Sequence, residues 1–187
     1  MYITAYAGIA PSRFEAALDR WHSTINAARI EDYTFVDLGC GKGRALLLAS
    51  RLPFREVIGI ELNPELAAIA QQNADRWRNL GEAASPIRVQ IGDATELVLP
   101  SEPTLLFLYN SFAEPMAHRL ASHLSHATTS PAIDLIYQNA YHAQVFNAHL
   151  GFRELWRTIL PLSIEDADAD PVASPDDLTA LFRIDIK

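Results

Sequence analysis

Residues 35–44 read Phe-Val-Asp-Leu-Gly-Cys-Gly-Lys-Gly-Arg, and this stretch decides the fold. The apolar run over residues 33–38 has the length and composition of a buried strand, and residues 44–52 predict a helix directly after it. Three glycines alternate with other residues at the turn between the two, namely Gly39, Gly41 and Gly43. Glycines here let a ligand approach bare backbone beside the positive end of a helix. In an open parallel sheet this turn lies at the carboxyl ends of the strands, where ligands bind.

The spacing of the glycines bears on the kind of ligand. A plain strand-to-helix turn needs only one or two glycines, and dinucleotide-binding loops follow G-x-G-x-x-G. That pattern would require a glycine at position 44, where the chain has Arg44. Asp37, two residues before Gly39, can meet a ligand's ammonium group and would repel a pyrophosphate. Because adenosylmethionine carries an ammonium on its methionine part, the loop favours it over a nicotinamide dinucleotide.

Two further acids end the next two expected strands. Glu61 lies at the end of residues 57–62, where an acid can accept hydrogen bonds from ribose hydroxyls, a feature shared with dinucleotide folds. Asp93 follows the strand over residues 87–91 and suits an adenine amino group. As alternatives, Glu61 caps the helix that starts at Pro64, and Asp93 caps a short helix. Acids at three consecutive strand ends favour one ligand site.

Short apolar runs alternate with amphipathic segments along the chain, which is typical of a βαβ series. The expected strands span residues 33–38, 57–62, 87–91, 105–109, 133–137, 152–160 and 178–186. A capping box at Ser12 and Glu15 precedes the first helix, and Asn63 with Pro64 starts the third. The last two strands flank an acidic run, residues 165–170, expected as a loop, so they should pair antiparallel.

The predicted fold is therefore α/β, with a doubly wound, mostly parallel seven-stranded sheet and an antiparallel C-terminal hairpin. Residues 31–187 form the predicted domain, and residues 1–30 form a helical or lid segment packed on its core.

The three motifs resemble those of a known family. Residues 35–44 resemble the first motif of class I S-adenosylmethionine-dependent methyltransferases, residues 57–61 the second and residues 91–94 the third. The resemblance runs from residue 33 to the C-terminus, and small stand-alone bacterial members are the most similar in style. It implies a Rossmann-like fold and S-adenosylmethionine as cofactor. The implied cofactor-binding residues are Asp37, Gly39, Cys40, Gly41 and Gly43 near the methionine part, Glu61 and Leu62 near the ribose, Asp93 and Ala94 near the adenine, and Asn110.

The segment after the fourth strand is where this family keeps its acceptor chemistry. Amino-directed DNA methyltransferases there carry Asn or Asp, two prolines and an aromatic residue, whereas this chain has Asn110, Ser111 and Phe112. The missing prolines weigh against methylation of a base nitrogen. Asn110 and Tyr109 are the predicted catalytic residues, and Ser111 with Glu114 is interpreted as a capping box. Other candidates at this mouth are Glu114, Tyr137, Asn139 and, on the N-terminal segment, Tyr2 and Tyr6.

Composition narrows the partners. The net charge is −8 and no Lys/Arg cluster is present, which disfavours a nucleic-acid acceptor. Cys40 is the only cysteine and is interpreted as a small loop filler rather than a nucleophile. No signal peptide or membrane-spanning run is expected, so a cytoplasmic protein is predicted. His123 and His126 lack the further ligands of a metal site.

The leading hypothesis is an S-adenosylmethionine-dependent methyltransferase that acts on a small molecule or a protein side chain. A non-catalytic S-adenosylmethionine-binding protein is the first alternative, and an NAD-dependent oxidoreductase is the second. The acceptor and the oligomeric state stay open.

Overall fold

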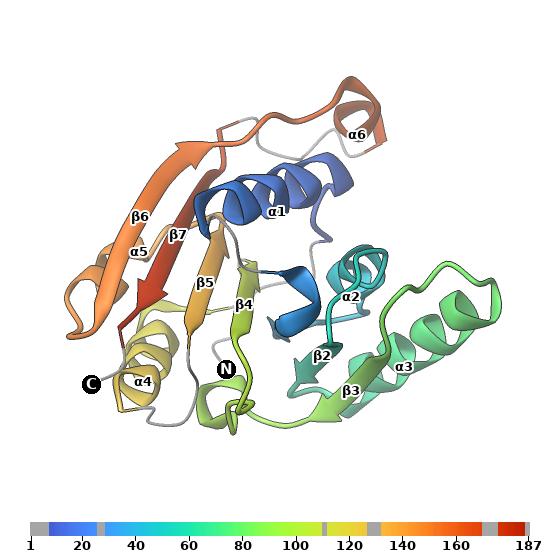
Figure 1. The fold of residues 1–187 in the computed structure, drawn as a ribbon, viewed down its shortest axis with the longest axis horizontal. Coiled ribbons are helices and arrows are strands. Elements are labelled where there is room, and N and C mark those ends of the chain that lie inside the picture. The colour runs from blue at the N-terminus through green and yellow to red at the C-terminus, as the bar shows by residue number, and fades with distance from the viewer. Residues whose placement is uncertain (1–7, 26–28, 110–111, 127–131, 170–175, 186–187) are drawn as a thin grey trace.

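The computed structural model describes residues 8–25, 29–109, 112–126, 132–169 and 176–185. Its single sheet has seven strands in the order β3-β2-β1-β4-β5-β7-β6. The strands are β1 (Thr34–Leu38), β2 (Glu56–Glu61), β3 (Ile87–Ile91), β4 (Thr104–Tyr109), β5 (Ile133–Gln138), β6 (Phe152–Ile159) and β7 (Leu178–Ile184). Strands β1 to β5 run parallel, and β7 pairs antiparallel with both β5 and β6 (Figure 1). The predicted fold class is confirmed.

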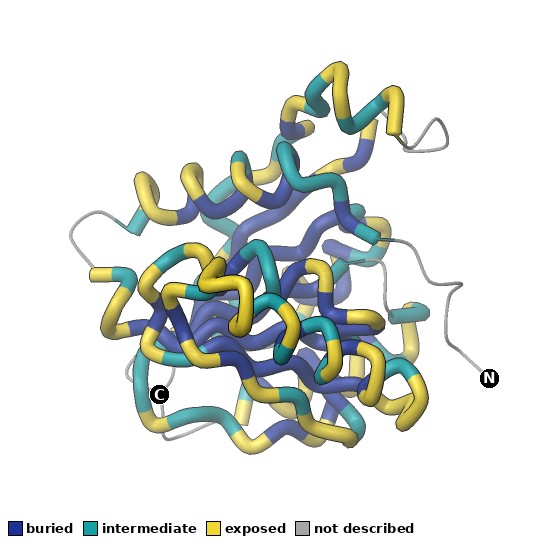
Figure 2. The backbone as a smooth tube through the Cα atoms, turned by 90° about the vertical axis from the view of Figure 1, so that its right-hand side faces the viewer, coloured by how far each residue is buried: buried dark blue, intermediate teal, exposed yellow. Residues whose placement is uncertain are grey.

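Helices cover both faces of the sheet, which explains why its central strands are apolar throughout. On one face lie α1 (Pro11–Ile25), α2 (Arg44–Ala49) and α3 (Pro64–Asn79), and on the other lie α4 (Glu114–Ser125) and α5 (Ala143–Asn147). Short 3₁₀ turns, η1 (Ile30–Asp32) and η2 (Ala94–Glu96), and a helix α6 (Ile164–Ala169) complete the elements. Figure 2 shows the buried strands between helices whose outer sides are exposed.

Successive strand residues face opposite layers, because side chains alternate across a sheet. Phe35 belongs to the core under α1, α2 and α3, whereas Val36 belongs to the core under α4 and α5. The strand order reverses between β1 and β4, since the chain leaves β1 in one direction and returns beside it on the other. Such a switch point opens a crevice at the carboxyl ends of the strands, which is where an α/β sheet binds its ligands.

Helix α1 is part of the core rather than an appendage. Trp21 is fully buried, its ring packs edge-on against Tyr33, and its indole N–H donates to Asp134 Oδ2 at 3.0 Å. The guanidinium of Arg183 also holds Asp134, through two hydrogen bonds of 2.8 and 2.9 Å. This buried charge is therefore paired, and it fixes α1 to β5 and β7. The boundary of the N-terminal segment at residue 30 stays a prediction.

Two predictions about the ends of the chain are wrong. Ser12 is not a helix cap: α1 already includes it, its backbone N–H donates to Asp166 Oδ2 at 2.8 Å, and its hydroxyl accepts from the Ser163 backbone at 3.0 Å. The acidic run is not a loop, because residues 164–169 form α6. The Ser163 hydroxyl accepts from the Asp166 backbone at 3.1 Å, and acids in a first turn favour the helix dipole.

The third helix has its predicted cap, and the fourth does not. Asn63 caps α3 by accepting hydrogen bonds from the Glu65 and Leu66 backbones. Helix α4 begins at Glu114 with Ala113 as its N-cap and no side-chain cap, so the capping box assigned to Ser111 is wrong.

Candidate functional site

The glycine loop leaves β1 and folds back over the end of β2. Gly39, Gly41 and Gly43 have φ angles of 84°, 55° and 85°, in the left-handed region that L side chains avoid. The backbone N–H groups of Gly39 and Cys40 donate to the Ile60 carbonyl at 2.9 and 3.0 Å. The loop therefore presents bare backbone beside the ends of two strands, and its shape depends on glycine.

Cys40 and Gly59 form a close contact beneath this loop. A Cβ at Gly59 would lie 2.8 Å from Cys40 Sγ and 2.6 Å from Leu46 Cδ1, so only glycine leaves room for the loop and α2. Cys40 is buried, and burial together with the charges of Asp37 and Glu61 raises the pKa of its thiol. This packing agrees with the interpretation of Cys40 as a loop filler. The role of Gly59 was missed, although it is the glycine in the middle of the second motif.

Two carboxylates are buried beside the loop. Asp37 is 4% exposed and Glu61 is 7% exposed. Burial, with a further contribution from the negative charge of Glu61, raises the pKa of Asp37 to about 8. No ion pair joins either acid to a cation in the part of the chain that the structure describes. Buried carboxylates without a cation are unfavourable, so this arrangement favours a positively charged ligand.

Glu61 also ties the site together. Its Oε2 accepts from the Gly41 backbone at 2.8 Å, and its Oε1 accepts from the Asn63 backbone at 2.9 Å. The carboxylate thus links the loop to the start of α3, while Asn63 itself caps that helix. A carboxylate has about four acceptor positions, so Glu61 retains capacity for hydroxyl donors of a ligand. Leu62, next in the chain, is 53% exposed.

Asp93 is the N-cap of the turn η2, which agrees with the alternative that it caps a short helix. Its Oδ1 accepts from the Thr95 backbone at 2.9 Å and from the Thr95 hydroxyl at 2.7 Å. Burial alone would raise the pKa of Asp93, but these bonds and the nearby Arg119 guanidinium lower it. Ala94 is buried directly after it. A role for Asp93 and Ala94 at an adenine stays a prediction.

A cavity of about 210 Å³ lies at the carboxyl ends of β4 and β5. Its lining includes Arg13 from α1, Arg44 after the glycine loop, Tyr109 at the end of β4, Gln138 at the end of β5 and Asp177 before β7. Tyr109 thus lies where the sequence expects it. The other four were not predicted as site residues, because three of them come from segments far from the motifs.

Tyr137 does not face this mouth, so that prediction is wrong. It is 2% exposed and belongs to the core under α4 and α5, where its ring packs against Phe146. Strand alternation places the next residue, Gln138, on the α1 side instead. The same alternation, read along the apolar positions of β5, would have identified Gln138 from the sequence.

The remaining candidates are less informative. Asn110 and Ser111 lie outside the described residues, as do Tyr2 and Tyr6. Asn139 has a φ of 57° at the end of β5, and Glu114 is exposed at the start of α4. His123 and His126 bond backbone carbonyls, and no group of three or more metal-ligating side chains occurs among the described residues. Within those residues, no helix has the length and apolar character needed to cross a membrane.

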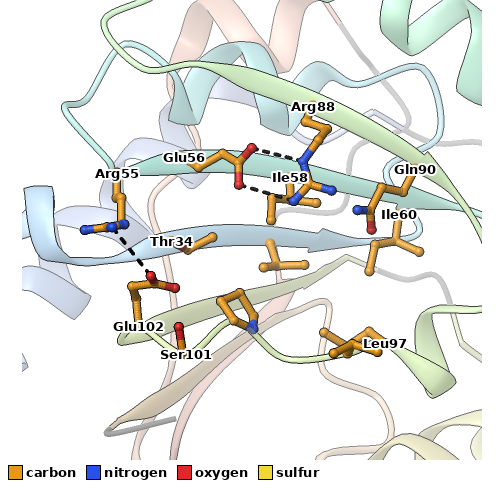
Figure 3. Close-up of a pocket in the computed structure, with 13 residues that line it drawn as sticks. Thr34, Arg55, Glu56, Ile58, Ile60, Arg88, Gln90, Leu97, Ser101 and Glu102 are labelled. Atoms are coloured by element: carbon orange, nitrogen blue, oxygen red, sulfur yellow. Dashed lines mark hydrogen bonds and ion pairs between the residues drawn. The ribbon is translucent and has the colours of Figure 1, made fainter. Parts of the chain in front are cut away.

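A second cavity, of about 320 Å³, lies on the other face of the sheet (Figure 3). It is bounded by β1, β2, β3 and residues 97–102, where the connection from β3 to β4 carries only η2. Its charged residues pair with one another: Arg88 bonds Glu56 at 3.0 and 3.2 Å, and Arg55 lies 3.5 Å from Glu102. With its charges already paired and on the face opposite Asp37, this cavity lacks the chemistry of the first.

Comparison with known proteins identifies the family to which the glycine loop and its neighbouring strands belong. A family model described as "Methyltransferase domain" matches residues 35–138, more than half of the chain, from β1 to the end of β5. The chain therefore belongs to this family, the S-adenosylmethionine-dependent methyltransferases, as the three motifs predicted.

Individual relatives match over shorter stretches. The release factor glutamine methyltransferase of Vibrio cholerae is 48% identical over 63 residues, covering 33% of this chain and 20% of that protein. The ribosomal protein L11 methyltransferase of Pseudoalteromonas atlantica is 34% identical over 101 residues, covering 52% of this chain and 30% of that protein. The chain thus spans less than a third of the length of either relative.

Among solved structures, an RNA methyltransferase from Salinibacter ruber in complex with S-adenosyl-L-homocysteine is similar in fold. Its TM-score is 0.57 at 18% identity, over 93% of this chain and 91% of that one.

Proposed function

We propose that this chain binds S-adenosylmethionine at the glycine loop and transfers its methyl group to a small molecule or a protein side chain. The observation that carries the proposal is the pair of buried acids, Asp37 and Glu61, which no cation of the described chain neutralises. S-adenosylmethionine is a cation with an ammonium, two ribose hydroxyls and an adenine. The bare backbone and acidic side chains of this site suit each of those parts.

Each part of the cofactor is assigned to residues at a different strand end. Asp37, with Gly39, Gly41 and Gly43 and the backbone of Cys40, would hold the methionine part. Glu61 would accept from the ribose hydroxyls beside Leu62, and Asp93 and Ala94 would border the adenine. Asp37 is the strongest of these assignments, because an ammonium placed against it would favour the ionised carboxylate and relieve the cost of its burial.

Catalysis needs little beyond orientation. When bound, S-adenosylmethionine supplies a methyl group on a sulfonium, which is already a strong electrophile. The chain's task is to hold the acceptor in line with it, and orientation of this kind lowers a barrier by about 7–11 kcal/mol. Tyr109 lines the cavity where an acceptor would lie, and Asn110 directly follows it. Both are proposed to position the acceptor.

Two observations bear on the acceptor class. The net charge is −8, which opposes binding to a phosphate backbone. Both relatives by sequence are named for protein acceptors, a release factor and a ribosomal protein. These support a small molecule or a protein side chain over nucleic acid.

Ligand binding and methyl transfer test the proposal separately. S-adenosylmethionine and S-adenosylhomocysteine should raise the melting temperature, and NAD should not. Asp37→Asn should weaken the effect, whereas Asp19→Asn, on the exposed side of α1, should leave it unchanged. Label from methyl-labelled S-adenosylmethionine should enter the protein or small-molecule fraction of a cell extract. Stabilisation by NAD alone would contradict the proposal, and tight binding without transfer in any fraction would favour a non-catalytic binder.

A further inference from the structure

The cavity at the ends of β4 and β5 contains hydrogen-bond donors that lack acceptors. Arg13 is 3% exposed and Gln138 is fully buried. Arg13 Nη1 donates to Asp177 Oδ2 at 3.0 Å, but its Nε and Nη2 have no partner in the described chain. Gln138 Oε1 accepts from the Thr179 hydroxyl at 2.9 Å, while its Nε2 has none. Buried donors without acceptors are rare in native proteins, because each loses its hydrogen bonds to water.

The acids around the cavity are already engaged. Asp177 pairs with Arg13, and Asp166 accepts from the Ser12 backbone at 2.8 Å. Arg44 donates to the Ile9 carbonyl at 3.3 Å. Among the described side chains, the buried donors left without a partner at this cavity are one edge of the Arg13 guanidinium and the amide NH₂ of Gln138. Both groups are hydrogen-bond donors, so they suit a ligand with acceptor atoms, and the guanidinium favours an anion.

The free edge of Arg13 has a definite shape. Nε and Nη2 carry parallel N–H groups in one plane, which match the two oxygens of a carboxylate. Gln138, whose buried amide nitrogen is the second donor without a partner in the described chain, also lines this cavity. The volume of about 210 Å³ is small beside pockets of roughly 300–1,000 Å³ for drug-sized ligands. It suits a compact carboxylic acid.

The cavity lies on the same side of the sheet as the proposed cofactor site. Asp37 pairs in register with Phe107, and Phe107 pairs with Ile136. Register partners share a face, and Gln138, two residues after Ile136, shares it too. Arg44, which also lines the cavity, directly follows Gly43 of the glycine loop. An acceptor in the cavity would therefore lie beside the methionine part of the cofactor.

We propose that this cavity is the acceptor site and that it binds a compact acceptor carrying a carboxylate, held by the Nε–Nη2 edge of Arg13 and the amide of Gln138. The inference rests on the proposed function, since it names the substrate class of the same site. Arg13 and Gln138 are then specificity-determining residues, supplied by α1 and β5.

The test measures binding of small carboxylates to the full chain loaded with S-adenosylhomocysteine. The probes are acetate, benzoate and 3-phenylpropionate, each compared with its primary alcohol, by ligand-observed NMR titration. At least one carboxylate should bind saturably while its alcohol does not. Arg13→Lys keeps the charge but removes the planar edge, and should weaken binding about tenfold to a hundredfold. Arg20→Lys, on the exposed side of α1, should have no effect.

Gln138→Glu provides a second variant that keeps the acceptor for Thr179 and replaces the free donor with a negative charge. It should abolish carboxylate binding without loss of the fold, whereas Gln72→Glu on the surface of α3 should not. If the chain binds S-adenosylhomocysteine but no carboxylate better than its alcohol, this inference is overturned and the proposed function stands. Carboxylate binding unchanged by both Arg13→Lys and Gln138→Glu would also overturn it. Failure to bind S-adenosylhomocysteine would instead overturn the proposed function.

Discussion

The two halves of the sheet build their parts of the site in different ways. In the half formed by β1, β2 and β3, each proposed ligand-binding residue lies at the carboxyl end of its own strand or in the turn directly after it, within residues 37–94. In the half formed by β4, β5 and β7, the cavity brings together Arg13, Gln138 and Asp177. Arg13 and Gln138 are more than a hundred residues apart in the sequence. The cofactor half is local in sequence and the acceptor half is assembled by tertiary packing. One fold can thus keep the same binding site for the methyl donor while its site for the methyl acceptor varies.

The largest expected effect comes from filling the space at Gly59. Gly59→Val should destabilise the chain by about 3 kcal/mol, because a side chain there meets Cys40 and the fully buried Leu46. Gly92→Val offers a matched control, since a Cβ at Gly92 meets nothing within 4 Å. Urea unfolding of both variants measures the difference. Equal stabilities would show that the glycine loop does not depend on this contact.

Asp37→Asn should separate the cofactor half from the acceptor half. Loss of a hydrogen bond to a charged group costs about 1.5–3 kcal/mol, so S-adenosylmethionine should bind roughly tenfold to a hundredfold more weakly. Carboxylate probes should still reach the cavity at saturating cofactor. Calorimetric titration of both ligands checks this. Unchanged affinity for S-adenosylmethionine would remove Asp37 from the site.

The same residue predicts a pH dependence of stability. The unfolded chain releases the Asp37 proton near pH 3.8, whereas the folded chain keeps it until about pH 8. The folded state then binds more protons between these values, so this group makes the free energy of unfolding fall as the pH rises from about 4 to about 8. Asp37→Asn should lose this component and be the more stable chain at pH 8. Parallel slopes for the two chains would contradict the prediction.

A smaller effect is expected at the outer wall of the acceptor cavity. Ser163→Ala removes the hydroxyl that accepts from the Asp166 backbone, and caps of this kind contribute about 1 kcal/mol. Carboxylate binding should weaken slightly, because Asp166 lines the cavity, while cofactor binding should not change. Thermal unfolding with and without S-adenosylhomocysteine measures stability and cofactor binding, and NMR titration with the carboxylate that binds measures the other. A change in cofactor affinity alone would contradict the assignment of α6 to the acceptor cavity.

The smallest effect belongs to the cavity on the opposite face. Arg88→Gln breaks the pair with Glu56, which is partly exposed, so the loss should be at most about 1 kcal/mol. Neither cofactor nor carboxylate binding should respond. A marked fall in either affinity would give this second cavity a role in the site.

The contrast between local sequence patterns and tertiary packing explains which features could be predicted from the sequence. The seven strands, the antiparallel end of the sheet, the glycine loop and the Asn63 cap all follow from local patterns, and the structure contains them. The prediction for Tyr137 is wrong because side chains alternate along β5, which places Gln138 and not Tyr137 at the cavity. Residues 164–169 form α6 in place of the predicted loop, because the Ser163 hydroxyl caps the helix and the acids of its first turn favour the helix dipole. Arg13 was not predictable, since only the packing of α1 on β5 and β7 brings it to Asp177.

The central claim is that a cationic cofactor binds against Asp37. Calorimetric titration with S-adenosylmethionine at pH 7, in two buffers of different ionisation enthalpy, tests it most directly. With a pKa of about 8, Asp37 is mostly protonated in the free chain, so binding should release close to one proton. The Asp37→Asn chain should bind more weakly and release none. Binding of NAD in place of S-adenosylmethionine, or proton release that persists in Asp37→Asn, would contradict the claim.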